Sequence, residues 1–232
     1  MAREKREKST LREWIEVIII SVVLAVIIKT YIVGSFKIPT GSMEDTLLVG
    51  DHFLASRFIY RFTDPKPGDV IVFRYPLDPG RDFVKRCVAV EGQTVQLKEK
   101  VLYIDGQRVA DPPESKHVDP RVYSTGFSTR DNFGPLKVPL GHLFVLGDNR
   151  DNSRDSRYWG FLDEGLVKGK AFMLYWSWKR LPGDPQLASW EGPIYAALPK
   201  FVFSFLKVLA FDIIHLPWRV RWSRIGDLIR AY

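Results

Sequence analysis

The chain of 232 residues is 46% apolar, which is enough to form the core of one globular domain of ordinary size. Its formal charge of +7 lies mainly at the two ends: residues 1–13 carry five Lys/Arg against three Asp/Glu, and residues 200–232 carry six against two. Residues 14–199 are nearly neutral, whereas a nucleic-acid-binding protein is expected to have a basic face on its folded body. The charge therefore argues against nucleic acid as a partner and favours a membrane surface.

Cysteine and histidine usage predicts neither a disulfide nor a metal site. Cys87 is the only cysteine, which excludes an intrachain disulfide and a metal site built of cysteines. The four histidines show no metal-ligand spacing: His52, His117, His142 and His215. We predict no metal and no cofactor, and the sequence leaves the oligomeric state open.

An apolar run near the N-terminus is the first element in chain order. From Val17 to Ile28 only Ser21 is polar, and residues 14–33 extend the run to the length that spans a bilayer. The basic residues of segment 1–12 predict a cytoplasmic N-terminus. We therefore predict a transmembrane anchor at 13–33 in the inner or plasma membrane, with the following chain outside the cytoplasm. A buried core helix and a cleaved signal peptide are the alternatives.

Residues 34–192 are predicted to fold as an all-β body of antiparallel sheets. Strand patterns occur at 68–76, 83–92, 101–109, 142–148 and 170–178. The dipeptide Asp105-Gly106 predicts a hairpin turn inside the third of these. Residues 101–140 are predicted to form a hairpin and loop insert, whose polar part has no obvious chemistry.

The C-terminal segment, 193–232, is predicted to contain an amphipathic helix that lies on the membrane. Its polar residues fall near helical spacing: Lys200, Ser204, Lys207, Asp212 and His215. A cluster typical of a membrane interface comes next: Trp218, Arg219, Arg221, Trp222 and Arg224. A second span and a helix packed on the body are the alternatives. Ser204 and Lys207 form an S-x-x-K pattern, but the companion motifs of penicillin-binding proteins are absent.

A candidate nucleophile, Ser42, lies in the segment "IPTGSMEDTLLVGD" shortly after the apolar run. A serine hydroxyl needs a base to remove its proton, and none of the histidines lies in a catalytic motif. Lys85 is the best candidate, because strand alternation places it on one face with Phe83, Cys87 and Ala89. Burial on that face would lower its pKa toward roughly 7–8. A turn role for Ser42 and a solvent-facing Lys85 are the alternatives.

A polar loop, "GDNRDNSRDSRYWG" at 147–160, comes directly after a predicted strand. Turn formation and an ordinary ion pair between Asp155 and Arg157 explain part of its composition. Four segments together resemble the ordered boxes of the type I signal peptidases, or leader peptidases: "IPTGSMEDTLLVGD", "KPGDVIVFRYP", "DFVKRCVAVEGQTV" and "GHLFVLGDNRDNSRDSRYWGF". The resemblance covers residues 36 to about 172.

This resemblance implies a membrane-bound serine endopeptidase that cleaves signal peptides from exported preproteins after small residues (Ala-x-Ala). It makes Ser42 the nucleophile and Lys85 the general base of a Ser/Lys dyad that forms an acyl-enzyme. It implies that Ser153 orients the lysine and that Thr40, with the Ser42 backbone N–H, forms the oxyanion hole. The resemblance also implies that Asp155 and Arg157 form an ion pair with a structural role.

The resemblance also implies shallow apolar pockets for a substrate that binds as an added strand. Their lining would be Phe36, Ile38, Met43, Leu47, Phe53, Phe83 and Val84. Asp45 departs from the family, which usually has proline there, and this predicts a local change of turn. The partners implied are preprotein signal peptides and membrane lipid.

Two other functions are compatible with parts of the pattern. One is a self-cleaving repressor-type protease with the same dyad, which the apolar anchor and the lack of a DNA-binding domain disfavour. The other is a membrane-anchored β-domain that binds a partner without catalysis. The distance between Ser42 Oγ and Lys85 Nζ discriminates between catalysis and simple binding.

Overall fold

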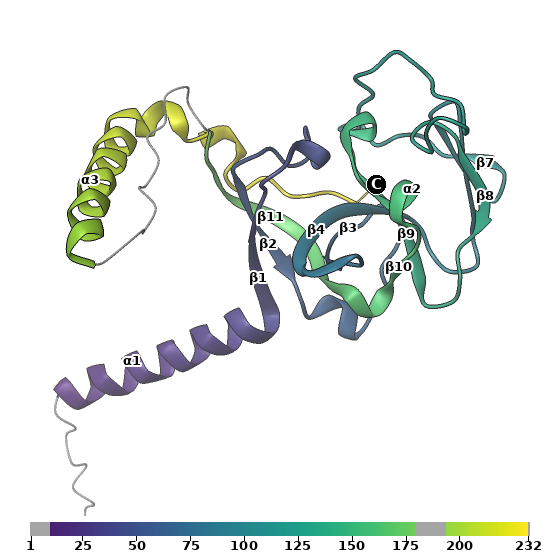
Figure 1. Ribbon diagram of the computed structural model, residues 1–232. Helices are drawn as coiled ribbons and strands as arrows, with labels where there is room; N and C mark the ends of the chain where they lie inside the picture. The colour runs from purple at the N-terminus through teal and green to yellow at the C-terminus, as the bar shows by residue number, and fades with distance from the viewer. Residues whose placement is uncertain (1–9, 180–193, 232) are drawn as a thin grey trace, which may run out of the picture.

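The structure is a computed structural model that describes residues 10–179 and 194–231 (Figure 1). Most of the basic residues of the predicted cytoplasmic segment lie outside the described residues, namely Arg3, Lys5, Arg6 and Lys8. The predicted boundary between residues 192 and 193 lies outside them as well. The described chain forms a β-rich body from which two long helices project (Figure 1).

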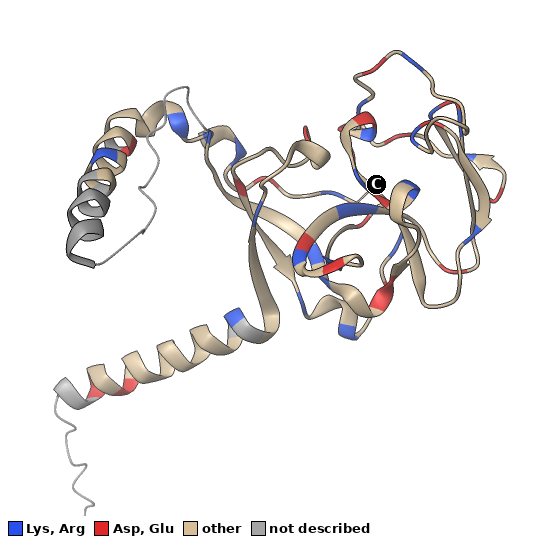
Figure 2. Cartoon of the chain, viewed as in Figure 1, with Lys and Arg blue, Asp and Glu red and all other residues tan. Residues whose placement is uncertain are grey.

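The N-terminal apolar run forms helix α1 (Thr10–Ile27), which continues into a π-helical turn, Ile28–Ile32. The large apolar side chains of α1 are 45% to 65% exposed, so the helix is not the buried core helix that was one alternative. Figure 2 shows no charged residue between Glu16 and Lys29. Within the part of the chain that is described, no helix combines the length and hydropathy required of a membrane span.

The main sheet has seven antiparallel strands in the order β1-β2-β11-β3-β4-β9-β10. Their bounds are β1 (Val33–Lys37), β2 (Asp51–Ser56), β3 (Val70–Tyr75), β4 (Asp78–Ala89), β9 (His142–Leu146), β10 (Leu162–Asp163) and β11 (Val167–Ser177). The central strand β3 reads VIVFRY, and all of its residues except Arg74 are buried. β-branched and aromatic residues suit such a doubly covered strand. The predicted antiparallel all-β body is therefore confirmed.

A second, four-stranded antiparallel sheet has the order β7-β6-β5-β8. It consists of β5 (Thr94–Lys98), β6 (Val101–Ile104), β7 (Gln107–Arg108) and β8 (Phe133–Lys137). The predicted hairpin turn is present, with φ of 52° at Asp105 and 78° at Gly106, as a type I′ turn requires. This sheet begins at β5, before the predicted insert, and its buried Val95, Leu97 and Leu102 pack against Phe144 of β9.

The C-terminal segment forms helix α3 (Ile194–Arg219) and then returns to the main sheet. Residues 220–231, which we call the C-terminal tail, hydrogen-bond along β11: Gly226 N–H donates to Leu174 O, and Ile229 N–H donates to Phe172 O. The tail and β11 therefore belong to one body, which argues against the second-span alternative for this segment.

The predicted interface cluster divides into two kinds of residue. Trp218 and Trp222 are 74% and 57% exposed. Arg219 instead pairs with Asp212 of the same helix, and Arg221 and Arg224 pair with the buried Asp51 at the start of β2. Carboxylates of the chain itself thus bind the three arginines of the predicted cluster, whereas its two tryptophans are exposed.

Candidate active site

Ser42 lies in a short 3₁₀ turn, Gly41–Met43, between β1 and β2. Met43 anchors the turn because its side chain is buried in the core below. Asn149 holds the turn from the other side: its side-chain amide donates to Gly41 O (3.1 Å) and its backbone N–H to Ser42 O (3.2 Å). The serine is thus fixed between the core and the polar loop after β9.

Gly147 makes this close approach possible. A Cβ atom at this position would come within 2.1 Å of Ser153 Oγ and 2.5 Å of Ser42 O. Contacts that short do not occur, so only glycine allows the loop to lie against both serines. The strand pairing of β4 with β9 brings this loop beside Lys85, since Arg86 pairs with Leu146 at the end of β9.

Lys85 lies on β4 and is 3% exposed. Its Nζ is 2.6 Å from Ser42 Oγ and also donates to Val84 O (2.9 Å). Burial lowers the pKa of Lys85 to about 8, while Asp155 and Asp148 act in the opposite direction. A neutral amine within hydrogen-bond distance of a serine hydroxyl can accept its proton.

A groove of about 860 Å³ contains both side chains. Five of the seven predicted substrate-binding residues line it: Phe36, Ile38, Met43, Phe83 and Val84. The other two, Leu47 and Phe53, do not line it, because both are fully buried in the core beneath the Ser42 turn. The apolar wall suits small or apolar side chains of a bound peptide.

Thr40 and Ser153 also line the groove. Thr40 is exposed and precedes the Ser42 turn in an extended conformation. Ser153 Oγ is buried but makes no hydrogen bond to Lys85, whose Nζ bonds to Ser42 and Val84. The structure brings Ser153 to the lysine's surroundings without the predicted contact.

Asp155 and Arg157 form a buried bidentate ion pair, with contacts of 2.7 Å. Burial would raise the pKa of Asp155, but the Arg157 guanidinium and the hydrogen bonds that the carboxylate accepts together hold that pKa below its ordinary value. Asp155 also accepts a hydrogen bond from the Gly147 N–H (3.0 Å). The ion pair therefore fixes the start of the loop that contacts Ser42.

A second buried ion pair, Arg86 with Asp148, was not predicted from the sequence. Asp148 accepts bonds from Arg86 Nε (2.9 Å) and Nη2 (2.7 Å), and its Oδ2 also accepts from Thr46 Oγ1 (2.6 Å). The sequence feature that could have indicated this pair is Arg86 itself, an arginine beside Lys85 in an apolar strand. A fully buried arginine needs a carboxylate partner.

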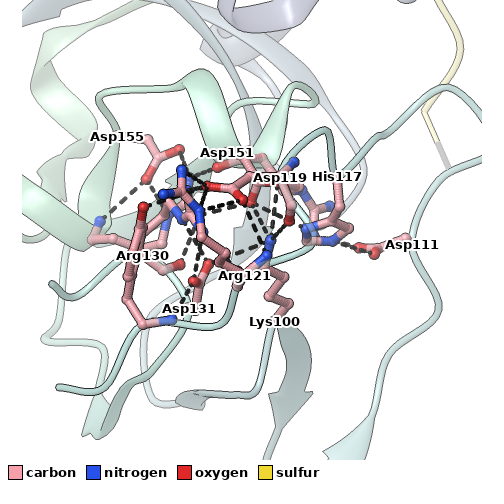
Figure 3. Close-up of polar contacts among 12 residues, drawn as sticks. Lys100, Asp111, His117, Asp119, Arg121, Arg130, Asp131, Asp151 and Asp155 are labelled. Atoms are coloured by element: carbon pink, nitrogen blue, oxygen red, sulfur yellow. Dashed lines mark hydrogen bonds and ion pairs between the residues drawn. The ribbon is translucent and has the colours of Figure 1, made fainter.

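Lys100 and the polar loops of the predicted insert, which begins at the next residue, bind the 147–160 loop (Figure 3). Asp151, whose side chain is 2% exposed, accepts two bonds of 3.0 Å from Lys100 Nζ and one from the Asp119 N–H (2.8 Å). Arg157 donates to Arg130 O (2.8 Å). A segment without predicted chemistry therefore braces the loop that carries Ser153.

Asp45 has a φ of +80°. Proline fixes φ near −65°, so the proline that the resemblance implies at this position is incompatible with the backbone. The Asp45 carboxylate lies 3.0 Å from Lys116 Nζ. The local change of turn that was predicted at Asp45 thus corresponds to the left-handed backbone conformation of this residue.

A buried lysine that contacts a serine inside an apolar groove is the arrangement of serine hydrolases that use lysine in place of histidine. Among the described residues, no group of three or more His, Cys, Asp and Glu side chains is placed to hold a metal ion. A β-rich body with such a groove is the arrangement expected of a serine hydrolase.

Comparison with known proteins places the chain within this class. The family model "Signal peptidase, peptidase S26" matches residues 11–176. The chain belongs to this family. It is 32% identical to signal peptidase I of Aquifex aeolicus, over 80% of this chain and 91% of that protein. It is 33% identical to signal peptidase I of Bacillus licheniformis, over 78% of this chain and 98% of that protein.

A solved structure of a signal peptidase I from Enterococcus faecalis is also similar, with 28% sequence identity and a TM-score of 0.37. The matched region covers 47% of this chain and 97% of the Enterococcus faecalis chain. The residues after 176, which include α3 and the C-terminal tail, lie outside the family match.

Proposed function

We propose that this protein is a membrane-bound signal peptidase that cleaves preproteins after small residues, with Ser42 as nucleophile and Lys85 as general base. The observation that carries the proposal is the 2.6 Å contact between Lys85 Nζ and Ser42 Oγ at a lysine that is 3% exposed. Membership of the signal peptidase family supports the reaction class.

The proposed reaction is acyl transfer. Neutral Lys85 accepts the proton of Ser42 as Oγ attacks the scissile carbonyl carbon. The protonated lysine then donates that proton to the leaving amine, which departs as the N-terminus of the mature protein. Lys85 next removes a proton from water, which attacks the acyl carbon, and returns that proton to Ser42 Oγ as the acyl–Oγ bond breaks and the signal peptide leaves with a new carboxyl end.

Two hydroxyl groups are assigned supporting roles. Thr40 Oγ1 and the Ser42 N–H are proposed to bind the oxyanion, and loss of one such donor costs about 10²–10³ in rate. Thr40 is exposed at the groove and can reach a bound carbonyl. Ser153 is proposed to receive a hydrogen bond from Lys85 once Ser42 is acylated and no longer available as its partner.

Helix α1 is proposed to be the membrane anchor, with the N-terminus in the cytoplasm and the β-rich body outside it. Its large apolar side chains are exposed, and α1 leads through the π-helical turn directly into β1. β1 carries Phe36, which lines the groove. Such an anchor would hold the groove near the lipid surface, where a signal peptide emerges from the membrane.

The test is processing of a preprotein bearing Ala-x-Ala by the full chain in detergent micelles. Lys85→Ala and Ser42→Ala are each expected to abolish cleavage, because either change removes one half of the dyad. A variant with all four histidines replaced is the control and is expected to remain active. Full activity of Lys85→Ala would disprove the dyad, and a lack of cleavage by the unaltered protein would favour a non-catalytic binding domain.

A further inference from the structure

The C-terminal tail lies against the loop that comes after the nucleophile. This loop, residues 44–50, connects the Ser42 turn to β2 and ends at Gly50, which has a φ of +90°. Trp178 of the main body donates its N–H to Gly50 O (3.0 Å), and Arg219 O accepts from the Lys179 N–H (2.8 Å). The end of α3 is thus fixed close to the loop, and the tail continues from there.

Asp51 is the centre of the contact between the loop and the tail. Its carboxylate is fully buried and accepts hydrogen bonds from the Leu48 N–H (2.8 Å) and Ser177 Oγ (2.6 Å). Arg221 Nη1 (3.2 Å) and Arg224 Nη2 (2.8 Å) supply the compensating positive charge. A buried carboxylate that lost these cations would be strongly unfavourable, so the tail and the loop depend on each other.

The same arginines also bind backbone carbonyls of the loop. Arg224 Nη2 donates to Thr46 O (3.0 Å), four residues after Ser42. Arg221 donates through both terminal nitrogens to Val49 O, at 3.3 Å each. These bonds define the path of the backbone between the nucleophile and β2.

Two further contacts connect the tail to the site. Thr46, held through its carbonyl by Arg224, donates through Oγ1 to Asp148, the ion-pair partner of Arg86. Arg86, next to Lys85, donates from Nη1 to Arg230 O of the tail (3.1 Å). Ile229 of the tail joins the core cluster that contains Met43. The tail thus contacts the immediate surroundings of both Ser42 and Lys85.

We propose that the C-terminal tail is a positioning element of the active site: Arg224, assisted by Arg221, holds the 44–50 loop so that Ser42 Oγ remains within reach of Lys85. This inference rests on the proposed function. Residues 220–231 do not line the groove, and their polar contacts are with the surroundings of the dyad. Loss of these contacts therefore affects the chemical step, not substrate binding.

The test compares Arg224→Gln, Arg224→Lys and the unaltered full chain in detergent micelles, with the same Ala-x-Ala preprotein. Gln removes the charge and the forked geometry, whereas Lys keeps the charge. Arg224→Gln is expected to lower kcat by about tenfold to hundredfold, because a small misplacement of reacting groups has effects of that size. KM is expected to stay unchanged, and Arg224→Lys is expected to recover part of the lost kcat.

The matched control is Arg108→Gln, at an exposed arginine of β7 in the other sheet, which is expected to leave kcat unchanged. Near-ultraviolet circular dichroism gives the folded fraction of each variant. The inference is overturned if folded Arg224→Gln has the same kcat as the unaltered protein. It is also overturned if the fall in kcat is no larger than the fall in the folded fraction. Lys85→Ala is assayed in parallel: if it remains active the proposed function fails, and if it is inactive only the tail inference is at stake.

Discussion

The protonation state of Lys85 is set by two opposing influences. Burial on β4 disfavours the ammonium form, and the carboxylates of Asp155 and Asp148 favour it; the result is a pKa of about 8. Each carboxylate is paired with its own arginine, and Arg157 lowers the pKa of Lys85, in opposition to Asp155. The same ion pairs that hold the loop therefore also influence the base.

This pKa predicts the pH dependence of cleavage. Only the neutral amine can accept the Ser42 proton, so kcat/KM is expected to rise as the pH increases through about 8 and then level off. Initial rates on a preprotein between about pH 6 and pH 10 measure this directly. A profile without a rising limb in that range contradicts a lysine base. The variant with all histidines replaced is the control, since its limb is expected at the same pH.

Asp45 gives a prediction about stability. Its φ of +80° is available to glycine and closed to proline. Asp45→Pro is therefore expected to lower the free energy of unfolding by more than about 1 kcal/mol. Asp45→Gly is the matched control and is expected to change it by less, since the ion pair with Lys116 is exposed. Urea denaturation measures both, and a more stable proline variant would refute the left-handed conformation.

At the scale of elements, the segment from Lys100 to Arg130 serves as a brace for the loop at 147–160. Its contacts converge on Asp151, whose side chain is 2% exposed and lies near Lys100, His117 and Arg130 (Figure 3). These bonds join residues far apart in the chain, so the brace forms only when both sheets are in place.

Asp151→Asn tests the brace. Removing one partner from a buried ionic network leaves the others unpaired, which typically costs about 3–5 kcal/mol. We expect a loss of that order in the free energy of unfolding, together with lower kcat, because the loop also carries Ser153. Asp64→Asn, at an exposed aspartate, is the control for loss of one negative charge. If both variants unfold at the same urea concentration, the network contributes nothing to stability.

Local patterns in the sequence were sufficient for some elements and not for others. The strand at β3 and the hairpin turn at Asp105-Gly106 depend on neighbouring residues, so both were predictable. The brace at Asp151 and the bonds from the tail to Asp51 join polar residues that are distant in sequence, and no periodic pattern marks such pairs. Lys85 could be found because strand alternation placed it among apolar residues. The expectation that Leu47 and Phe53 line the groove was wrong, because the local sequence does not show how deeply a side chain is buried.

At the scale of the whole molecule, α1 and α3 both project from the body (Figure 1), yet they are connected to the main sheet differently. α1 leads into β1, an edge strand of that sheet. α3 is bounded on both sides by the same strand: β11 precedes it, and the tail after it pairs with β11. If the β-rich body lies outside the cytoplasm as proposed, both ends of the segment between β11 and the tail are expected to lie on that same side.

A reporter fused after Tyr232 tests this arrangement. A phosphatase that is active only outside the cytoplasm is expected to be active there, because the tail hydrogen-bonds to the sheet that carries Lys85. The same reporter fused before Met1 is the control and is expected to be inactive, as the basic N-terminal segment favours the cytoplasm. An inactive C-terminal fusion in a protein that still cleaves preproteins would mean that the tail is separated from β11 in the membrane. Activity at the C-terminus and none at the N-terminus requires an odd number of crossings, which a single span in α1 satisfies.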